Sequence, residues 1–225
     1  MEIFLKIFIF IFLFFNVLIL TGARICIAGG AVFGQPSHLG NNRTTNIFNP
    51  ENFTQVLNFK LEESTLYGIR NVLGYTPILE KGHTSEYEAR IVYFINSGSE
   101  KIEFFSDELH GADLGLSDFA VSKVSQTEKF KKKELSIKKI NVCGLHLGME
   151  RKDVDKLINI KNIAGGFSCA VEKKSNDEII YHFFKGIKWV NKKKEIMEGE
   201  EGIDISMIYQ GGILSSFSVG KATST

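Results

Sequence analysis

The stretch from Gly144 to Asn159 constrains the fold more than any other part of the sequence. It predicts a short extended entry, a glycine turn and then an amphipathic helix of about three turns. The apolar residues of the helix are spaced i, i+3, i+4, so they fall on one face together with the methionine that precedes them. Charged residues fill the other positions from 150 to 156, so we expect the helix to lie with this face on an apolar surface. The residues of the face are Met149, Val154, Leu157 and Ile158.

Residues 1–23 are typical of a secretory signal peptide. Lys6 precedes an apolar run, Ile7 to Phe15, that is too short for a comfortable membrane span, and Thr21-Gly22-Ala23 offers small residues for a signal peptidase. A second cleavage position follows Ala28. We expect a periplasmic or secreted protein; the alternative is anchoring by an uncleaved N-terminal segment. Residues 24–52 are rich in Gly and Asn and are expected to form a flexible tail.

Two folded units are expected beyond this tail, over residues 53–124 and 140–225. In each unit a helix precedes strands, which are indicated by β-branched and aromatic runs between clusters of turn residues. The expected fold class is α+β, with two tandem modules that each pack a short helix or helices on a three-stranded antiparallel sheet. We place the strands at 90–95, 101–105 and 114–121, then at 178–184, 202–209 and 213–219, with 185–201 as a charged insertion.

A short internal repeat supports two units. The segment Ile69–Gly74 superimposes on Val154–Asn159 at an offset of 85 residues (154 − 69 = 85). Thr65 then falls on Glu150 at the position that caps a helix. The match is short, and coincidence is the alternative explanation.

The residues from Leu145 to Ile158 carry a resemblance to a known family. Their pattern, Leu-x-Leu-Gly-Met-x-x-x-Asp-Val-x-x-Leu-Ile, resembles the LGMSxxEVxxLLG signature of small bacterial envelope modules of the SmpA/OmlA, or BamE-like, group. In that group helices precede a three-stranded antiparallel sheet, and the tandem β-lactamase-inhibitor proteins look like two such modules in one chain. The resemblance implies protein binding, not catalysis. The chain departs from the signature at Glu150, where the family has Ser, and at Asn159-Ile160-Lys161, where the family has Gly-x-Pro.

The cysteines lie at positions 26, 143 and 169. Cleavage after Ala28 would remove Cys26 and leave Cys143 and Cys169, which we expect to form a disulfide in an exported protein. Closing a loop of about 25 residues stabilises a fold by on the order of 3 kcal/mol in the chain-entropy model. The alternative is a pair of buried thiols.

Residues suited to catalysis or metal binding are scattered. Two carboxylate–histidine clusters lie in predicted loops, but neither has the second pair of ligands that a metal site requires. A histidine at 182 lies in a predicted strand, where a structural or surface role is expected rather than that of a base. We predict no catalytic, cofactor-binding or metal-binding residues, and therefore no enzyme. The two clusters are His83 with Glu86 and Glu88, and His110 with Asp113.

The charge pattern bears on partners. The net charge of +1 argues against nucleic acid, which usually requires a strong basic excess. Residues 125–139 form a basic connector, either a solvated linker or strand edge, or a patch for anionic lipid headgroups or an acidic partner. The lysines that would make weak contact with an anionic membrane surface are Lys129, Lys131, Lys132 and Lys133.

These features favour an exported, non-catalytic protein-binding or scaffold protein of the bacterial cell envelope, with another envelope or secreted protein as its partner. One alternative is a secreted or periplasmic inhibitor that covers an exported enzyme with the sheets of both modules. A second alternative is a hydrolase with a site assembled from His83, Glu86, Glu88 or His110. A deep pocket joining those residues would favour the hydrolase.

Overall fold

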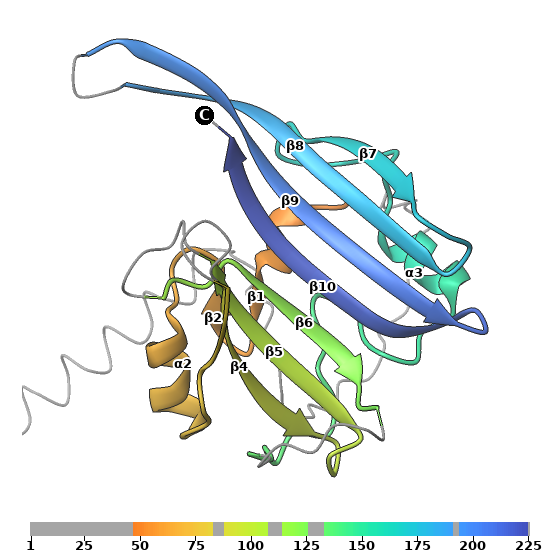
Figure 1. Cartoon of the computed structure of the whole chain (residues 1–225). Coiled ribbons are helices and arrows are strands. Elements are labelled where there is room, and N and C mark those ends of the chain that lie inside the picture. The colour runs from red at the N-terminus through yellow and green to blue at the C-terminus, as the bar shows by residue number, and fades with distance from the viewer. Residues whose placement is uncertain (1–46, 83–87, 108–113, 126–132, 191–193, 225) are drawn as a thin grey trace, which may run out of the picture.

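A computed structural model describes residues 47–82, 88–107, 114–125, 133–190 and 194–224. Its main element is one antiparallel sheet of eight strands in the order β3-β4-β5-β6-β10-β9-β8-β7 (Figure 1). The first half of the chain supplies β3 (Leu79–Lys81), β4 (Glu88–Ile95), β5 (Glu100–Asp107) and β6 (Asp118–Lys123). The second half supplies β7 (Ser168–Lys173), β8 (Glu178–Val190), β9 (Ile196–Gln210) and β10 (Ile213–Ser224).

The expected α+β fold of two modules, each with its own three-stranded sheet, is wrong, because the structure is mostly β and has one eight-stranded sheet with two short helices. Strands β6 and β10 pair directly, with Phe217 opposite Val121, so the two halves share a single sheet. Each half also contributes a fourth strand, β3 or β7, that the sequence did not predict. Both are outer strands. β3 has three residues and β7 is largely exposed, so neither carries the alternation of apolar and polar residues by which a strand is recognised.

The prediction of a charged insertion at 185–201 is also wrong. β8 and β9 stay paired through this region, from Lys185 opposite Glu201 to Val190 opposite Ile196. The paired ribbon continues beyond the ends of the neighbouring strands (Figure 1). Opposite charges across the two strands, such as Lys188 and Glu198 at 2.5 Å, support pairing without an apolar face. Their polarity made the segment resemble a loop in the sequence.

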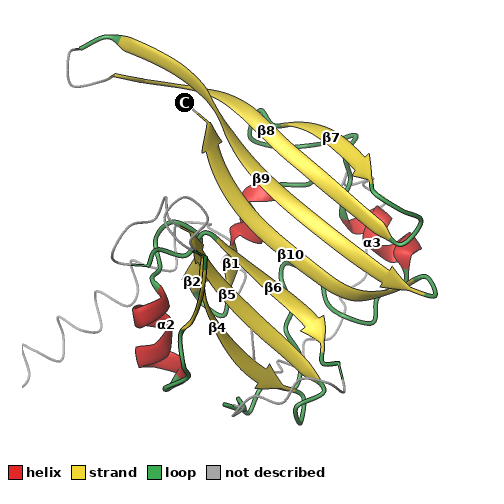
Figure 2. Ribbon diagram, viewed as in Figure 1, coloured by secondary structure: helices red, strands yellow, loops and turns green. Residues whose placement is uncertain are grey.

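Two short α-helices lie on one side of the sheet (Figure 2). Helix α2 (Leu66–Leu73) begins at Thr65, whose hydroxyl accepts a hydrogen bond from the Gly68 amide at 3.0 Å, and it ends at Gly74 with φ of 93°. Helix α3 (Arg151–Leu157) begins at Glu150 without a side-chain cap. It is shorter than the three turns expected and ends at Ile158.

The segment before α2 belongs to the folded body. It contains the 3₁₀ helix η1 (Pro50–Thr54) and a small hairpin of β1 (Gln55–Val56) and β2 (Phe59–Lys60). Phe48, expected to lie in the flexible tail, is buried, and its ring centroid lies 5.1 Å from that of Phe183 on β8. Its backbone amide donates to the Asn162 carbonyl at 2.9 Å. The expected tail at 24–52 therefore ends before Phe48.

A single hydrophobic core lies between this side of the sheet and the covering elements. Alternate residues of the long strands, such as Phe104, Phe119, Ile205 and Phe217, are buried in one cluster with residues of both helices and of η1. Residues with this period of two point to the same side of a sheet. The helices and the N-terminal segment therefore all cover one face, and the alternate residues point to the other.

The described part of the basic connector runs along the sheet. The Phe94 amide donates to the Lys133 carbonyl at 2.9 Å, and the Asn96 amide donates to the Ile137 carbonyl at 2.9 Å. These bonds occupy the outer edge of β4 beyond the reach of β3, which pairs with residues 88–90. Residues 133–137 are thus attached to the sheet.

Candidate binding face

The face opposite the core is built from the outward residues of four neighbouring strands. They form two rows that cross the strands, because antiparallel partners lie directly opposite each other. One row is Asp118, Gly220, Asp204 and His182, and the other is Ala120, Ser218, Ser206 and Ile180, from β6, β10, β9 and β8 in turn. Ile208 on β9 and Phe184 on β8 extend the surface, and all ten residues are half-buried or exposed. We call this set the open face.

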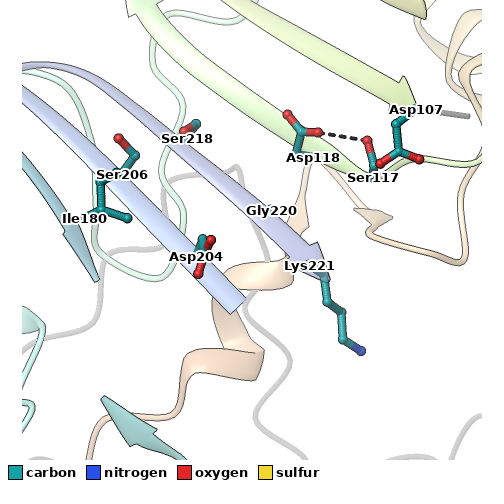
Figure 3. Close-up of a pocket in the computed structure, with 9 residues that line it drawn as sticks. All are labelled: Asp107, Ser117, Asp118, Ile180, Asp204, Ser206, Ser218, Gly220 and Lys221. Atoms are coloured by element: carbon teal, nitrogen blue, oxygen red, sulfur yellow. Dashed lines mark hydrogen bonds between the residues drawn. The ribbon is translucent and has the colours of Figure 1, made fainter. Parts of the chain in front are cut away.

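The centre of the open face is hollowed, with a volume of about 290 Å³ (Figure 3). The hollow forms because its floor carries only small side chains, the hydroxyls of Ser206 and Ser218 and none at Gly220. Gly220 separates Asp118 from Asp204, whose Cα atoms lie two strand spacings apart, about 10 Å. A Cβ atom at Gly220 would meet that of Asp118 at 3.4 Å, so a larger residue would fill the gap.

His182 lies beside the hollow between two carboxylates. Its Nδ1 lies 2.9 Å from Asp204 Oδ1 on β9, and its Nε2 lies 3.4 Å from Glu172 Oε2 on β7. Partial burial alone would lower the pKa of His182, but the hydrogen bonds and charges of Asp204 and Glu172 outweigh it and raise the pKa above 6.5. Both ring nitrogens face carboxylates rather than a hydroxyl or thiol. This geometry favours the protonated form of His182.

Apolar side chains flank the polar centre. Phe184 is 37% exposed and Ile208 is 41% exposed, and Ile180 lies half-buried in the row beside Ser206. Exposed apolar groups beside small polar ones are found at surfaces that bind a partner or a ligand.

A chain of ion pairs fixes one end of the hollow. Lys221 lines the hollow, and its ammonium group lies 3.0 Å from Glu62 Oε2 and 2.5 Å from Glu201 Oε1. Glu201 also contacts Lys185, which in turn lies 3.3 Å from Glu51 on η1. Burial would raise the pKa of Glu201, but hydrogen bonds from Lys221 and Lys185 outweigh it and hold the pKa below 4.5. These pairs tie the N-terminal segment to β8, β9 and β10.

A second charged cluster lies on the open-face side of the sheet, in the strands of the first half. Glu103 on β5 is buried and accepts from Arg90 at 3.1 Å and from Lys101 at 2.8 Å. All three residues alternate with core residues of β4 and β5. Two cations therefore flank the single buried carboxylate of this cluster.

The structure places the residues of the predicted helix face against the core. Val154 and Ile158 are buried, and Met149 and Leu157 are partly buried and packed on the core cluster. Contacts from α3 reach the end of the second half of the sheet: the Tyr181 hydroxyl donates to Asp155 at 3.3 Å, and the Arg151 guanidinium lies 5.7 Å from the centre of the Tyr209 ring.

The expected disulfide is not formed in the structure. The Cys143 thiol donates to the Asn52 carbonyl at 3.0 Å, and the Cys169 thiol lies 3.5 Å from the Ala170 carbonyl. Both are partly buried against the core, and burial raises the pKa of the Cys169 thiol to about 11. The two cysteines therefore match the alternative of packed thiols. The pairing in an oxidising compartment stays a prediction.

Several predicted residues lie outside the described part of the chain. They include the signal peptide and, from the histidine clusters, His83, Glu86, His110 and Asp113. Glu88 is the first residue of β4. Of the predicted membrane-contacting lysines only Lys133 is described, and it is exposed. Within the described ranges no group of three or more His, Cys, Asp or Glu side chains is arranged to hold a metal ion.

The open face was missed in the sequence, although part of its signal was present. In the predicted strand at 202–209, Ile203, Ile205 and Met207 alternate with Asp204 and Ser206, so the latter two fall on the opposite face. The pairing of β10 with β6 had no such signal, because strand order depends on contacts distant in sequence.

Searches of protein-family models, curated proteins and solved structures found no match to this chain. Among the described helices, none combines the length and the apolar composition needed to cross a membrane.

Proposed function

We propose that this chain is an exported, non-catalytic protein-binding protein whose partner docks on the open face. The observation that supports this most directly is the pair of rows across β6, β10, β9 and β8, with a hollow over Ser206, Ser218 and Gly220. A sheet normally buries one face against its own core and needs no cover on the other when that side is polar. Here the second side is mixed, with half-exposed Phe184 and Ile208 beside the polar hollow, which favours a surface that a partner covers.

The shape of the face also supports docking of a protruding partner residue. The hollow is wide enough for a side chain, and its floor offers hydroxyl donors and acceptors without long side chains that would first have to move. Strands hold these groups in place by backbone pairing on both sides. A preorganised surface loses less conformational entropy on binding than a mobile one.

Site-specific photocrosslinking tests this proposal. A benzophenone amino acid replaces Phe184 at the edge of the open face, where an aromatic side chain already stands, and in a matched control it replaces Lys156 on the exposed side of α3. Irradiation of the producing cells and their culture medium should yield one discrete heavier species from position 184 only, and Ser218→Arg in the hollow should remove that species. The proposal fails if position 184 gives no product, or if position 156 gives the same product.

The identity of the crosslinked protein decides between the scaffold and the inhibitor. If the partner is an enzyme, we expect the purified protein to lower its activity and Ser218→Arg to restore it. A partner without activity, or an enzyme whose rate is unchanged, supports the scaffold.

Export is a separate part of the proposal, supported by the sequence of residues 1–23. N-terminal sequencing of protein made in a secreting host should begin at Arg24 or Gly29. Soluble cytoplasmic protein with an intact Met1 would contradict export and leave the binding face untouched.

A further inference from the structure

We propose that the outer side of α2 is a docking surface for an anionic lipid bilayer. The surface comprises Tyr67, Arg70, Val72, Tyr75 and Lys133, which we call the α2 patch. It lies on a different element from the open face and uses none of its residues.

The α2 patch exposes large side chains that a folded protein usually buries. Tyr67 is 50% exposed, Val72 is 72% exposed and Tyr75 is 73% exposed, although Leu66 and Ile69 of the same helix are fully buried. The helix lies beside β2 and β4 at the border of the molecule, so its outer side is accessible (Figure 1). Tyrosine suits a membrane interface, because its ring is apolar and its hydroxyl remains hydrated.

The charges of the α2 patch have one sign. The guanidinium of Arg70 lies 4.4 Å from the ring centre of Tyr75 and 6.0 Å from that of Tyr67, so two aromatic rings flank the cation. Between Ser64 and Leu79 the chain contains no acidic residue. A planar arginine beside aromatic rings can bind a phosphate group while the rings contact the glycerol and acyl region.

Lys133 adds a second cation at the end of the helix. Its Nζ lies 3.3 Å from the position that a Cβ atom of Gly74 would occupy, next to Tyr75 in the chain. Lys133 is held there by the backbone bond between its carbonyl and the Phe94 amide. Glu134 follows and forms an isolated bridge with Phe94. Successive side chains of an extended segment point in opposite directions, so we expect its carboxylate to be directed away from Gly74.

Helix α3 differs from the α2 patch, because its exposed charges are of both signs. Its exposed lysines are paired within the helix, Lys152 with Glu150 at 2.5 Å and Lys156 with Asp153 at 2.9 Å. These pairs cancel locally, whereas neither Arg70 nor Lys133 has an acidic partner among the residues that the structure describes. An anionic surface attracts such cations by about 1 kcal/mol each, or about fivefold in binding.

Vesicle flotation tests the proposal on the full secreted protein. We expect the wild type to float with vesicles of equimolar phosphatidylcholine and phosphatidylglycerol, weakly with phosphatidylcholine alone, and less as salt is added. Arg70→Gln should lower the partition coefficient about fivefold. Lys156→Gln removes the same charge from α3 and should leave it unchanged. Thermal melts followed by circular dichroism establish that both variants are folded.

A fluorescent reporter locates the contact, because its emission depends on its own surroundings. The reporter variants share the same N-terminal segment, so any lipid affinity of that segment is equal in all of them. In a Trp189→Phe background, Tyr75→Trp should shift its emission to shorter wavelength on the anionic vesicles, and lipids with brominated chains should quench it. Lys156→Trp in the same background should do neither.

Three results would overturn the proposal. The first is a wild type that does not bind the anionic vesicles, and the second is equal loss of binding in Arg70→Gln and Lys156→Gln. The third is a tryptophan at position 75 that stays in water while the protein floats. If vesicles do not bind but Arg70→Gln abolishes capture of a protein partner, the α2 patch is a protein-binding site instead.

Discussion

The two halves of the sheet use the same backbone contact to attach their helices, but they stabilise it with different side chains. In each half the N-cap residue of the helix forms an isolated β-bridge to a residue at or just before the last strand of that half. Thr65 pairs with Gly115, just before β6, and Glu150 pairs with Ile213, the first residue of β10. The flanking hydrogen bonds correspond as well. They are Leu66 N to Leu114 O and Leu116 N to Ser64 O in the first half, and Arg151 N to Gly212 O and Leu214 N to Met149 O in the second.

The differences lie in the side chains and in strand length. Thr65 caps α2 through its hydroxyl, whereas Glu150 makes no side-chain cap for α3. The long strands of the second half are nearly twice those of the first: β9 has 15 residues and β5 has 8. The comparison indicates that the backbone docking of a helix on its last strand tolerates changes in capping and strand length. The shared core and the pairing of β6 with β10 then join the halves.

The largest expected effect comes from the core under each helix. Ile69→Ala should lower the free energy of unfolding by about 2–5 kcal/mol, because a fully buried isoleucine loses its contacts and leaves a cavity. Val154→Ala removes fewer buried groups, so we expect about 2 kcal/mol. Denaturant titration followed by circular dichroism measures both.

The same titration tests whether the halves unfold together. Because they share one sheet and one core, we expect a single transition that both variants shift. Lys156→Ala, on the exposed side of α3, should change the stability by less than about 0.5 kcal/mol. Two transitions, with Ile69→Ala moving only one, would mean that the halves are independent.

The ion pairs of the second half should give the next largest effect. Lys221→Met leaves Glu62 and Glu201 without their shared cation, and we expect a loss of about 1–2 kcal/mol at neutral pH. The pKa of Glu201 is lowered in the folded state, so its contribution is present above about pH 4.5 and is lost as pH falls through the folded value.

In Lys221→Met we therefore expect stability to fall less steeply below pH 4.5 than in the wild type. The matched control is Lys188→Met, which removes a cation from an exposed pair on the β8–β9 ribbon and should change little. Chemical denaturation over a series of acidic pH values measures the slopes. Parallel curves for Lys221→Met and the wild type would show that the ion pairs do not set the acid response.

The caps of the two helices should differ by about 1 kcal/mol. Thr65→Ala removes the hydroxyl that accepts from Gly68, and the usual cost is about 0.5–2 kcal/mol. Glu150→Ala removes no cap and should cost less than about 0.5 kcal/mol. Glu150→Thr should stabilise the protein if the backbone at the two caps is equivalent. Equal losses from the two alanine variants would contradict the difference in capping.

The local features of both helices could be predicted from the sequence. The spacing of apolar residues and the 85-residue offset identified the caps at Thr65 and Glu150 and the end of α2 at Gly74, since these depend on neighbours within a turn. The inward residues of β9 were also predictable, because Ile203, Ile205 and Met207 alternate with polar residues.

The remaining features depend on contacts between distant segments. The pairing of Phe217 with Val121 joins residues 96 positions apart (217 − 121 = 96), and no local pattern specifies it. β7 lies at a sheet edge and needs no apolar face, so its sequence resembles a loop. The open face combines outward residues of four strands, and it could not be assembled without the strand order.

The smallest expected effect concerns two charged clusters on the side of the sheet opposite the core, one in each half. Glu103 in the first half is held by Arg90 and Lys101, whereas the second half has the titratable His182 between Asp204 and Glu172. The pKa of His182 is raised above 6.5 in the folded state. Its contribution to stability is therefore present below pH 6.5 and is lost as pH rises through the folded value.

We expect the ring protons of His182 to titrate above pH 6.5 by NMR and, because Asp204 is the nearer carboxylate, Asp204→Asn to lower this pKa more than Glu172→Gln. The effect on stability should be small, since the cluster is partly exposed to solvent. Glu103→Gln is the control: it disturbs the first half and should leave the titration of His182 unchanged. If His182 titrates at or below pH 6.5, or if Asp204→Asn does not move it, the carboxylates do not hold the imidazolium.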